Sequence, residues 1–168
     1  ILTQNYPSHL LELLVIDDHS ADQTADIVRS FSDARLRLLR LGEGQGKKAA
    51  LALGAREARG SLLVTTDADC SPGPEWLRQL VGFYETTSFC MIAAPVLFQR
   101  ERSPLQRFQS LDYAGMMGLT GAGICSGRFY LGNGANLAYE KSLFEEINGF
   151  SGLSREIGRA SCRERVCH

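Results

Sequence analysis

The sequence predicts an α/β fold with a mainly parallel sheet flanked by helices. Short runs of aliphatic and β-branched residues, typical of buried strands, alternate with segments of helical periodicity. Two of these runs, residues 13–16 and 62–66, end in paired acids: Asp17 with Asp18, and Asp67 with Asp69. Because open α/β sheets bind ligands at the carboxyl ends of their strands, the acids predict a ligand site at one sheet edge.

The other elements can be placed in chain order. Ser20 and Gln23 have the spacing of a capping box and predict that a helix starts there. Gly60 is expected to close a helix that starts at Lys47, and Pro95 predicts an edge strand or a bulge. Further strands are predicted at 36–41, 91–98, 129–131 and 137–139, and further helices at 47–59, 76–84, 105–117 and 141–148.

Length, charge and cysteine content narrow the class of protein. The 168 residues suit one domain, and a net charge of −1 offers no basic face for nucleic acid. No apolar run approaches the roughly 20 residues of a membrane span, so no spanning helix is predicted within this sequence. The five cysteines include no CxxC pair, which favours a reducing compartment.

The two ends of the chain depart from the pattern of a complete domain. Ile1 opens in mid-pattern, and we expect that a first strand is missing before it. Residues from Glu156 onward have neither helical nor strand periodicity and resemble the translation of a sequencing-adapter oligonucleotide. We therefore expect a partial domain over residues 1–155 and a non-native tail over residues 156–168.

Asp67, Ala68 and Asp69 predict a metal site. Residues two apart in an extended segment point the same way, so both carboxylates can face one ligand. Mg²⁺ and Mn²⁺ take oxygen ligands and often bridge a carboxylate to substrate phosphates. The alternative is a solvated turn in which Asp69 caps the next helix.

Asp17, Asp18 and Lys47 are the candidate nucleotide contacts. A carboxylate at the end of the first strand could accept hydrogen bonds from a base or a ribose, and Lys47 could approach phosphates as a cation. The alternatives are a helix cap stabilised by the helix dipole for the acids and a solvated lysine at a helix start.

A dinucleotide-binding site competes with this interpretation. Gly44, Gly46 and Ala49 match the G-x-G-x-x-A fingerprint of NAD(P)-dependent oxidoreductases, with Asp67 about 20 residues further on. That fingerprint leaves the acids at residues 17, 18 and 69 without a role. A third possibility is a phosphatase of haloacid-dehalogenase type, with the Asp67-x-Asp69 pair supplying its nucleophile.

Taken together, the motifs resemble family 2 glycosyltransferases, the inverting class with a GT-A fold. The resemblance extends from Gln4 to Phe150. It rests on five stretches that occur in the family's order: Gln4-Asn5-Tyr6-Pro7, residues 15–24, residues 46–51, residues 66–69, and residues 132–139 with Asn148-Gly149-Phe150.

The resemblance implies a role for each motif. It implies that the nucleotide-sugar contacts are Asp17, Asp18, Lys47, Asp67 and Ala68, and that Asp69 with Asp67 ligates Mg²⁺ or Mn²⁺. It also implies an acceptor-side loop made of Gly132, Asn133, Gly134, Ala135 and Asn136, although viewed alone this loop could be a hairpin turn.

The implied reaction is transfer of a sugar from a UDP-sugar to the hydroxyl of a saccharide or lipid-linked acceptor. The implied setting is synthesis of cell-envelope polysaccharide or glycolipid in the cytoplasm, at the inner face of the membrane for a membrane-associated parent. The family's catalytic base lies in an acidic pair after the position of Gly149-Phe150, where this chain has residues 151–155. The base is thus expected beyond Arg155 and the fragment is expected to be inactive, which leaves a non-catalytic nucleotide-binding remnant as an alternative.

Overall fold

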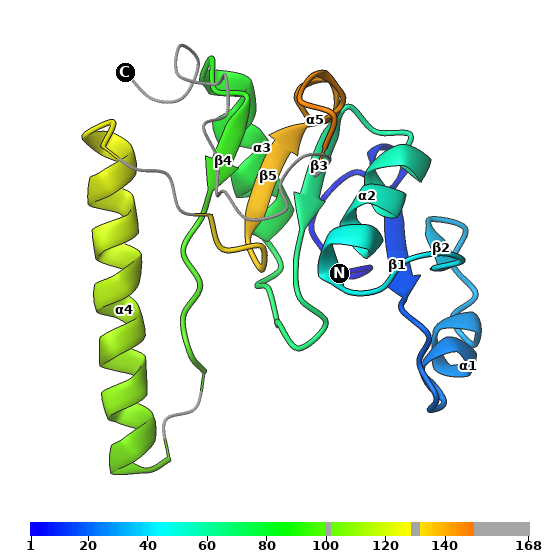
Figure 1. Ribbon diagram of the computed structural model, residues 1–168, viewed down its shortest axis with the longest axis horizontal. Helices are drawn as coiled ribbons and strands as arrows, with labels where there is room; N and C mark the ends of the chain where they lie inside the picture. Colours follow the sequence, from blue (N-terminus) through cyan, green and yellow to red (C-terminus); the bar gives the residue numbers. More distant parts are fainter. Residues whose placement is uncertain (100–101, 129–131, 150–168) are drawn as a thin grey trace.

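The computed structural model describes residues 1–99, 102–128 and 132–149, in which the strands form two sheets (Figure 1). In the first sheet, β1 (Leu13–Asp17) pairs in parallel with β2 (Leu36–Arg40). In the second, β5 (Leu137–Glu140) lies between β3 (Leu62–Thr65) and β4 (Met91–Ala93) and runs antiparallel to both. The predicted α/β class is confirmed, and the antiparallel β5 is a feature that the alternation of elements does not indicate.

Helices surround the two sheets (Figure 1). They are α1 (Thr24–Arg29), α2 (Lys47–Glu57), α3 (Trp76–Thr86), α4 (Pro104–Cys125) and α5 (Lys141–Glu146), preceded by a 3-10 turn, η1 (Ser8–Leu10). The core lies where α2 meets the second sheet, with Ala55, Leu63 and Tyr139 buried together.

The capping box predicted at Ser20 and Gln23 is wrong. Helix α1 begins at Thr24, and its cap residue Gln23 makes no side-chain cap bond. The Ser20 amide instead donates to Asp17 Oδ1 at 2.9 Å. A capping box does form at α4, where Ser103 accepts from the Gln106 amide at 3.2 Å and the Gln106 side chain accepts from the Ser103 amide at 3.1 Å.

The predicted end of α2 at Gly60 is also wrong, because the chain becomes extended already at Ala58. Two side chains satisfy the last carbonyls instead. Arg37 of β2 donates to Glu57 O at 3.1 Å, and Lys141 at the start of α5 donates to Ala58 O at 2.7 Å. Cations at this end also offset the negative end of the helix dipole, so α2 is tied to β2 of the first sheet and to α5, which follows β5 of the second.

The N-terminal segment is anchored to the turn before α3. Gln4 is buried; its Nε2 donates to Gly73 O at 2.7 Å and its Oε1 accepts from the Leu77 amide at 3.1 Å. Asn5 donates to Glu75 Oε1 at 2.7 Å. These bonds fix the loop that follows β3, where two of the predicted site acids lie.

The fourth strand is shorter and the following helix longer than predicted. β4 ends at Ala93, before Pro95, whereas α4 continues through its glycines to Cys125. Helix α4 lies to the side of the second sheet in Figure 1, and it exposes a set of large apolar side chains that we call the α4 stripe: Leu105, Phe108, Leu111, Met116 and Leu119. Among the described residues, no helix has both the length and the apolar character needed to cross a bilayer.

We predict that Gly149→Ala destabilises the fold, whereas Gly82→Ala does not. Gly149 has φ +58°, and a Cβ there would lie 2.8 Å from the Phe144 ring. The left-handed backbone alone costs about 1–2 kcal/mol for a non-glycine residue, so urea unfolding should show a loss of at least that size. Gly82, inside α3, has nothing within 4 Å of the position that a Cβ would take. Alanine there should raise the free energy of unfolding by at most about 1 kcal/mol, because alanine favours the helix more than glycine does. Equal effects of the two substitutions would contradict this account.

Candidate functional site

The candidate site forms where the ends of β1 and β3 meet the starts of α2 and β5. Thr65 at the end of β3 is in register with Leu137 at the start of β5. Since β5 runs antiparallel to β3, the loop before β5 and the loop after β3 lie at the same edge (Figure 1). The N-terminus of α2 reaches this edge through Lys47.

Asp17 and Asp18 are adjacent in sequence but have different environments. The Asp17 side chain is 0% exposed and accepts from the Ser20 amide at 2.9 Å and from Arg40 Nε at 3.0 Å. Hydrogen bonds from Ser20, followed by the bond from Arg40, lower the pKa of Asp17 to about 2. Its oxygens hold the loop after β1 in place, and its side chain is closed to solvent.

Asp18 lies on the solvent side of the same loop. Its Oδ2 accepts from the Gly46 amide at 2.7 Å, and its Oδ1 lies 3.1 Å from His19 Nδ1. The bond from His19, and then the bond from Gly46, lower the pKa of Asp18. The bond to Gly46, which has φ +87°, ties the end of β1 to the residue that precedes α2.

Lys47 connects the start of α2 to the loop after β3. Its Nζ lies 2.5 Å from Asp67 Oδ1. Gly134 packs against this side chain, because a Cβ on Gly134 would lie 3.3 Å from both Lys47 Cε and Nζ. Ala68 and Asp69 follow in an exposed turn closed by the Cys70 amide, which donates to Asp67 O at 3.1 Å.

The 132–136 loop is held by elements far apart in the sequence. Its bonds are those of Thr65 Oγ1 to Gly134 O at 2.7 Å, Trp76 Nε1 to Asn136 Oδ1 at 2.9 Å, Asn136 Nδ2 to Pro95 O at 2.9 Å, and Asn133 Nδ2 to the Tyr113 hydroxyl. Within the loop, the Ala135 amide donates to Asn133 Oδ1 at 3.0 Å. Both edges of β5 are paired with β3 and β4. The 129–131 segment predicted to flank the loop lies outside the described residues.

The carboxylates at the end of β3 offer the oxygen ligands that a hard divalent cation prefers, but they are too few to complete its coordination. Asp67 and Asp69 offer oxygen donors of the kind that Mg²⁺ and Mn²⁺ prefer. Among the described residues, no group of three or more His, Cys, Asp or Glu side chains is arranged to hold a metal ion. A cation here would therefore take further oxygens from water or from a ligand such as a diphosphate.

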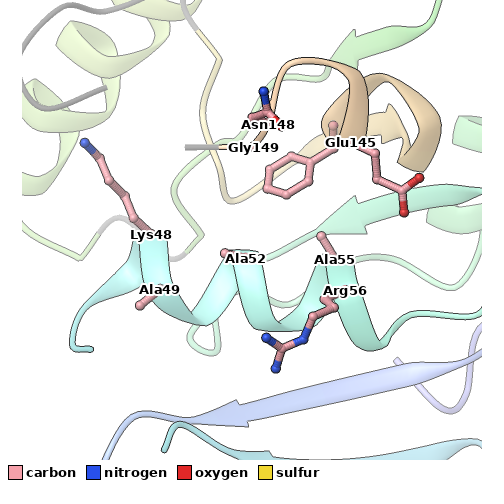
Figure 2. Close-up of a pocket in the computed structure, with 9 residues that line it drawn as sticks. Lys48, Ala49, Ala52, Ala55, Arg56, Glu145, Asn148 and Gly149 are labelled. Atoms are coloured by element: carbon pink, nitrogen blue, oxygen red, sulfur yellow. The ribbon is translucent and has the colours of Figure 1, made fainter. Parts of the chain in front are cut away.

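A groove that the sequence did not indicate runs along the other face of α2 (Figure 2). It has a volume of about 410 Å³, and its lining residues are Lys48, Ala49, Ala52, Ala55, Arg56, Phe144, Glu145, Asn148 and Gly149. None of the predicted nucleotide or metal contacts lines it. Lys47 and Lys48 thus serve different surfaces, since Lys47 contacts Asp67 and Lys48 borders the groove.

The structure brings together most of the predicted site residues. Asp18, Lys47, Asp67 and Gly134 are linked through the contacts given above, while Asp17 is turned inward. Supporting residues that sequence reasoning missed are Arg40, Thr65, Trp76 and Tyr113. Only Thr65 had a local signal, since it comes two residues before Asp67 in the strand run.

The sequence profile of glycosyl transferase family 2 matches residues 1–157. The chain belongs to this family. Its GT-A fold and its membership of this family, both predicted from the motifs, are confirmed. The residues where the catalytic base is expected, beyond Arg155, lie outside the described part of the chain.

Individual relatives agree with the family. Glycosyltransferase AglE from Haloferax volcanii is 36% identical over 100 residues, which cover 58% of this chain and 33% of AglE. The mannosyltransferase PcManGT from Pyrobaculum calidifontis, in complex with GDP-Man and Mn²⁺, has a TM-score of 0.63 at 25% identity, with 88% of this chain and 40% of that chain covered. S. aureus TarS 1–349 in complex with UDP-GlcNAc has a TM-score of 0.64 at 19% identity, covering 87% of this chain and 41% of that chain. This chain thus spans about a third to two fifths of these proteins' lengths.

Family membership and geometry both disfavour the dinucleotide fingerprint. The Gly46 amide, which such a fingerprint would aim at a pyrophosphate, donates to Asp18. Strands β2 and β3, which would be neighbours in a dinucleotide-binding unit, belong to different sheets. The phosphatase interpretation likewise has no support in the family match.

We predict that Asp17→Asn weakens the fold at neutral pH and flattens its acid dependence. A carboxyl whose pKa is lowered by folding stabilises the folded state above its unfolded pKa of about 4, and this stabilisation is lost as pH falls towards the folded pKa. For Asp17 that loss falls between about pH 4 and pH 2, since its folded pKa is about 2. Urea unfolding of both proteins at pH 7, 4 and 2.5 measures it. If the free energies of unfolding of the two proteins differ by the same amount at all three pH values, the role given to Asp17 is contradicted.

Proposed function

We propose that this chain carries the donor site of an inverting glycosyltransferase that uses a UDP-sugar and a divalent cation. The observation that carries the proposal is the pairing of Lys47 with Asp67 at 2.5 Å, at the strand-end edge where open α/β sheets bind ligands. The Lys47 ammonium can bind a diphosphate, while the neighbouring carboxylates of Asp67 and Asp69 bind the metal that accompanies it. The bound nucleotides of TarS and PcManGT, UDP-GlcNAc and GDP-Man, support a nucleotide-sugar donor.

The nucleoside would lie at the end of β1. Asp18 is exposed enough to accept hydrogen bonds from a base or ribose, and its bond to the Gly46 amide already holds the carboxylate in place. Asp17 and Arg40 would act by fixing the loop on which Asp18 sits. The diphosphate would then lie towards Lys47, with Asp67 and Ala68 beside it.

Asp69 and Asp67 would hold Mg²⁺ or Mn²⁺. When bound, such a cation offsets the negative charge that builds up on a departing diphosphate. Asp69 is exposed and in the turn next to Asp67, so both carboxylates can reach one ion whose remaining ligands are phosphate oxygens and water. The complex of PcManGT with Mn²⁺ supports this choice of metal.

The 132–136 loop would border the acceptor. Its bonds to Thr65, Trp76 and Tyr113 hold it rigidly beside the donor edge, which suits a surface that orients a sugar hydroxyl. An inverting transfer also needs a base that takes the proton of that hydroxyl. We propose a saccharide or lipid-linked acceptor, with the product entering cell-envelope polysaccharide or glycolipid at the cytoplasmic face of the membrane.

The donor site can be tested by calorimetric titration of UDP into the 168-residue chain with and without Mn²⁺. We expect UDP to bind more tightly with Mn²⁺, by about tenfold or more if the cation bridges protein and diphosphate. Asp69→Ala should remove most of that gain. Asp112→Ala, an exposed acid on α4, should leave it unchanged. Metal-independent binding, or an equal loss in both variants, would rule out the assignment.

Trp76 offers an independent readout of the same site, because it is the one tryptophan of the chain and bonds to Asn136 in the acceptor-side loop. We expect UDP with Mn²⁺ to change its emission, GDP to do so at higher concentration, and NADH to leave it unchanged apart from inner-filter absorption. Emission from Trp76→Phe gives the background. A saturable response to NADH alone would favour the oxidoreductase alternative.

A further inference from the structure

The ion pair between Lys47 and Asp67 occupies one of the two carboxylates proposed for the metal. The two side chains come from different elements, the start of α2 and the loop after β3. Both are open to solvent, with the Lys47 side chain 56% exposed and that of Asp67 40% exposed. Ligands and ions can therefore reach the pair without unfolding any part of the site.

Gly134 lies close to the end of the lysine side chain. A Cβ at Gly134 would stand 3.3 Å from Lys47 Cε and Nζ, tighter than ordinary van der Waals contact. The loop cannot retreat freely, because Thr65 donates to Gly134 O at 2.7 Å. The ammonium thus lies between a fixed backbone segment and the Asp67 carboxylate.

An ammonium and a divalent cation compete for the Asp67 carboxylate. Their charges repel over a few ångströms, even where water screens them. A cation entering the nucleotide-free site therefore binds Asp67 less tightly than it would if Lys47 carried no charge. A diphosphate changes this balance, since it offers Lys47 another anionic partner within reach of the same loop cluster.

Resting on the function proposed above, we propose that Lys47 is an internal counterion that moves between two partners. In the nucleotide-free protein it neutralises Asp67, and on donor binding it passes to the diphosphate and leaves Asp67 to the divalent cation. The nucleotide and the cation then bind interdependently, each raising the affinity for the other by the same factor.

Removing the Lys47 ammonium should change cation binding and UDP binding in opposite directions. Without it, a divalent cation meets no competitor at Asp67 and binds the nucleotide-free protein more tightly. UDP loses a cationic contact and binds more weakly. The coupling between UDP and the cation becomes smaller, although direct metal–phosphate bonds retain part of it.

The test measures Mn²⁺ and UDP separately on the 168-residue chain. Electron paramagnetic resonance of free Mn²⁺ gives metal affinity without nucleotide, and calorimetry gives UDP affinity with and without saturating Mn²⁺. The variants are Lys47→Met, which keeps the length without the charge, and Gly134→Ala, which presses on Lys47. Lys48→Met is the matched control, because it removes the same charge one residue away on the groove side of α2.

For Lys47→Met we expect nucleotide-free Mn²⁺ binding to tighten by about two- to fivefold, the range that one exposed ion pair supports. UDP binding should weaken and the coupling factor should fall. Gly134→Ala should shift Mn²⁺ binding in the same direction by less, and Lys48→Met should leave the coupling factor unchanged.

The outcomes distinguish this inference from the function on which it rests. If Lys47→Met leaves nucleotide-free Mn²⁺ binding and the coupling unchanged while UDP still binds with Mn²⁺, the counterion role is overturned and the donor site stands. If no form of the chain binds UDP at any Mn²⁺ concentration, the donor site itself is rejected. Equal shifts in Lys47→Met and Lys48→Met would reduce the effect to overall charge and also overturn the inference.

Discussion

The site depends on the antiparallel placement of β5 between β3 and β4. Ala138 at the middle of β5 is 0% exposed and is paired with strands on both sides. Because β5 runs opposite to β3, its first residue meets the last residue of β3, and the 132–136 loop comes to the loop that carries Asp67. A parallel β5 would carry that loop to the far edge of the sheet, and Lys47 would lose its contact with the Gly134 backbone.

Helix α2 supplies the second constraint, since it joins the two sheets without any strand pairing between them among the described residues. Its start is held by the Asp18–Gly46 and Lys47–Asp67 contacts, and its end by Arg37 and Lys141. The acids Asp18 and Asp67 thus lie near its N-terminus and the cations Arg37 and Lys141 near its C-terminus, as the helix dipole favours, although α2 itself begins with Lys47 and Lys48. The positions of the site residues relative to one another follow from how this helix is held.

The sequence predicted the acids of the site and their position at strand ends, because both signals are local: aliphatic runs followed at once by carboxylates. It treated Asp17 and Asp18 alike, although neighbouring residues leaving a strand face opposite sides, so that one is buried as a support and the other faces solvent. It did not find Trp76, Tyr113 or Arg40, because these contact the site across separations of 20 or more residues that no periodicity records. The capping-box spacing also misled at Ser20, because the Ser20 amide donates to the Asp17 carboxylate and not to the Gln23 side chain.

The α4 stripe has a consequence for how this polypeptide behaves in solution. Five large apolar side chains lie open on one helix that stands beside the second sheet, and exposed apolar patches of this kind promote association between molecules. With a net charge of −1, long-range repulsion does little to keep copies apart. Colloidal behaviour, rather than the free energy of folding, then sets the concentration at which the polypeptide can be handled. We expect polar replacements along the stripe to raise this concentration while leaving the candidate site untouched.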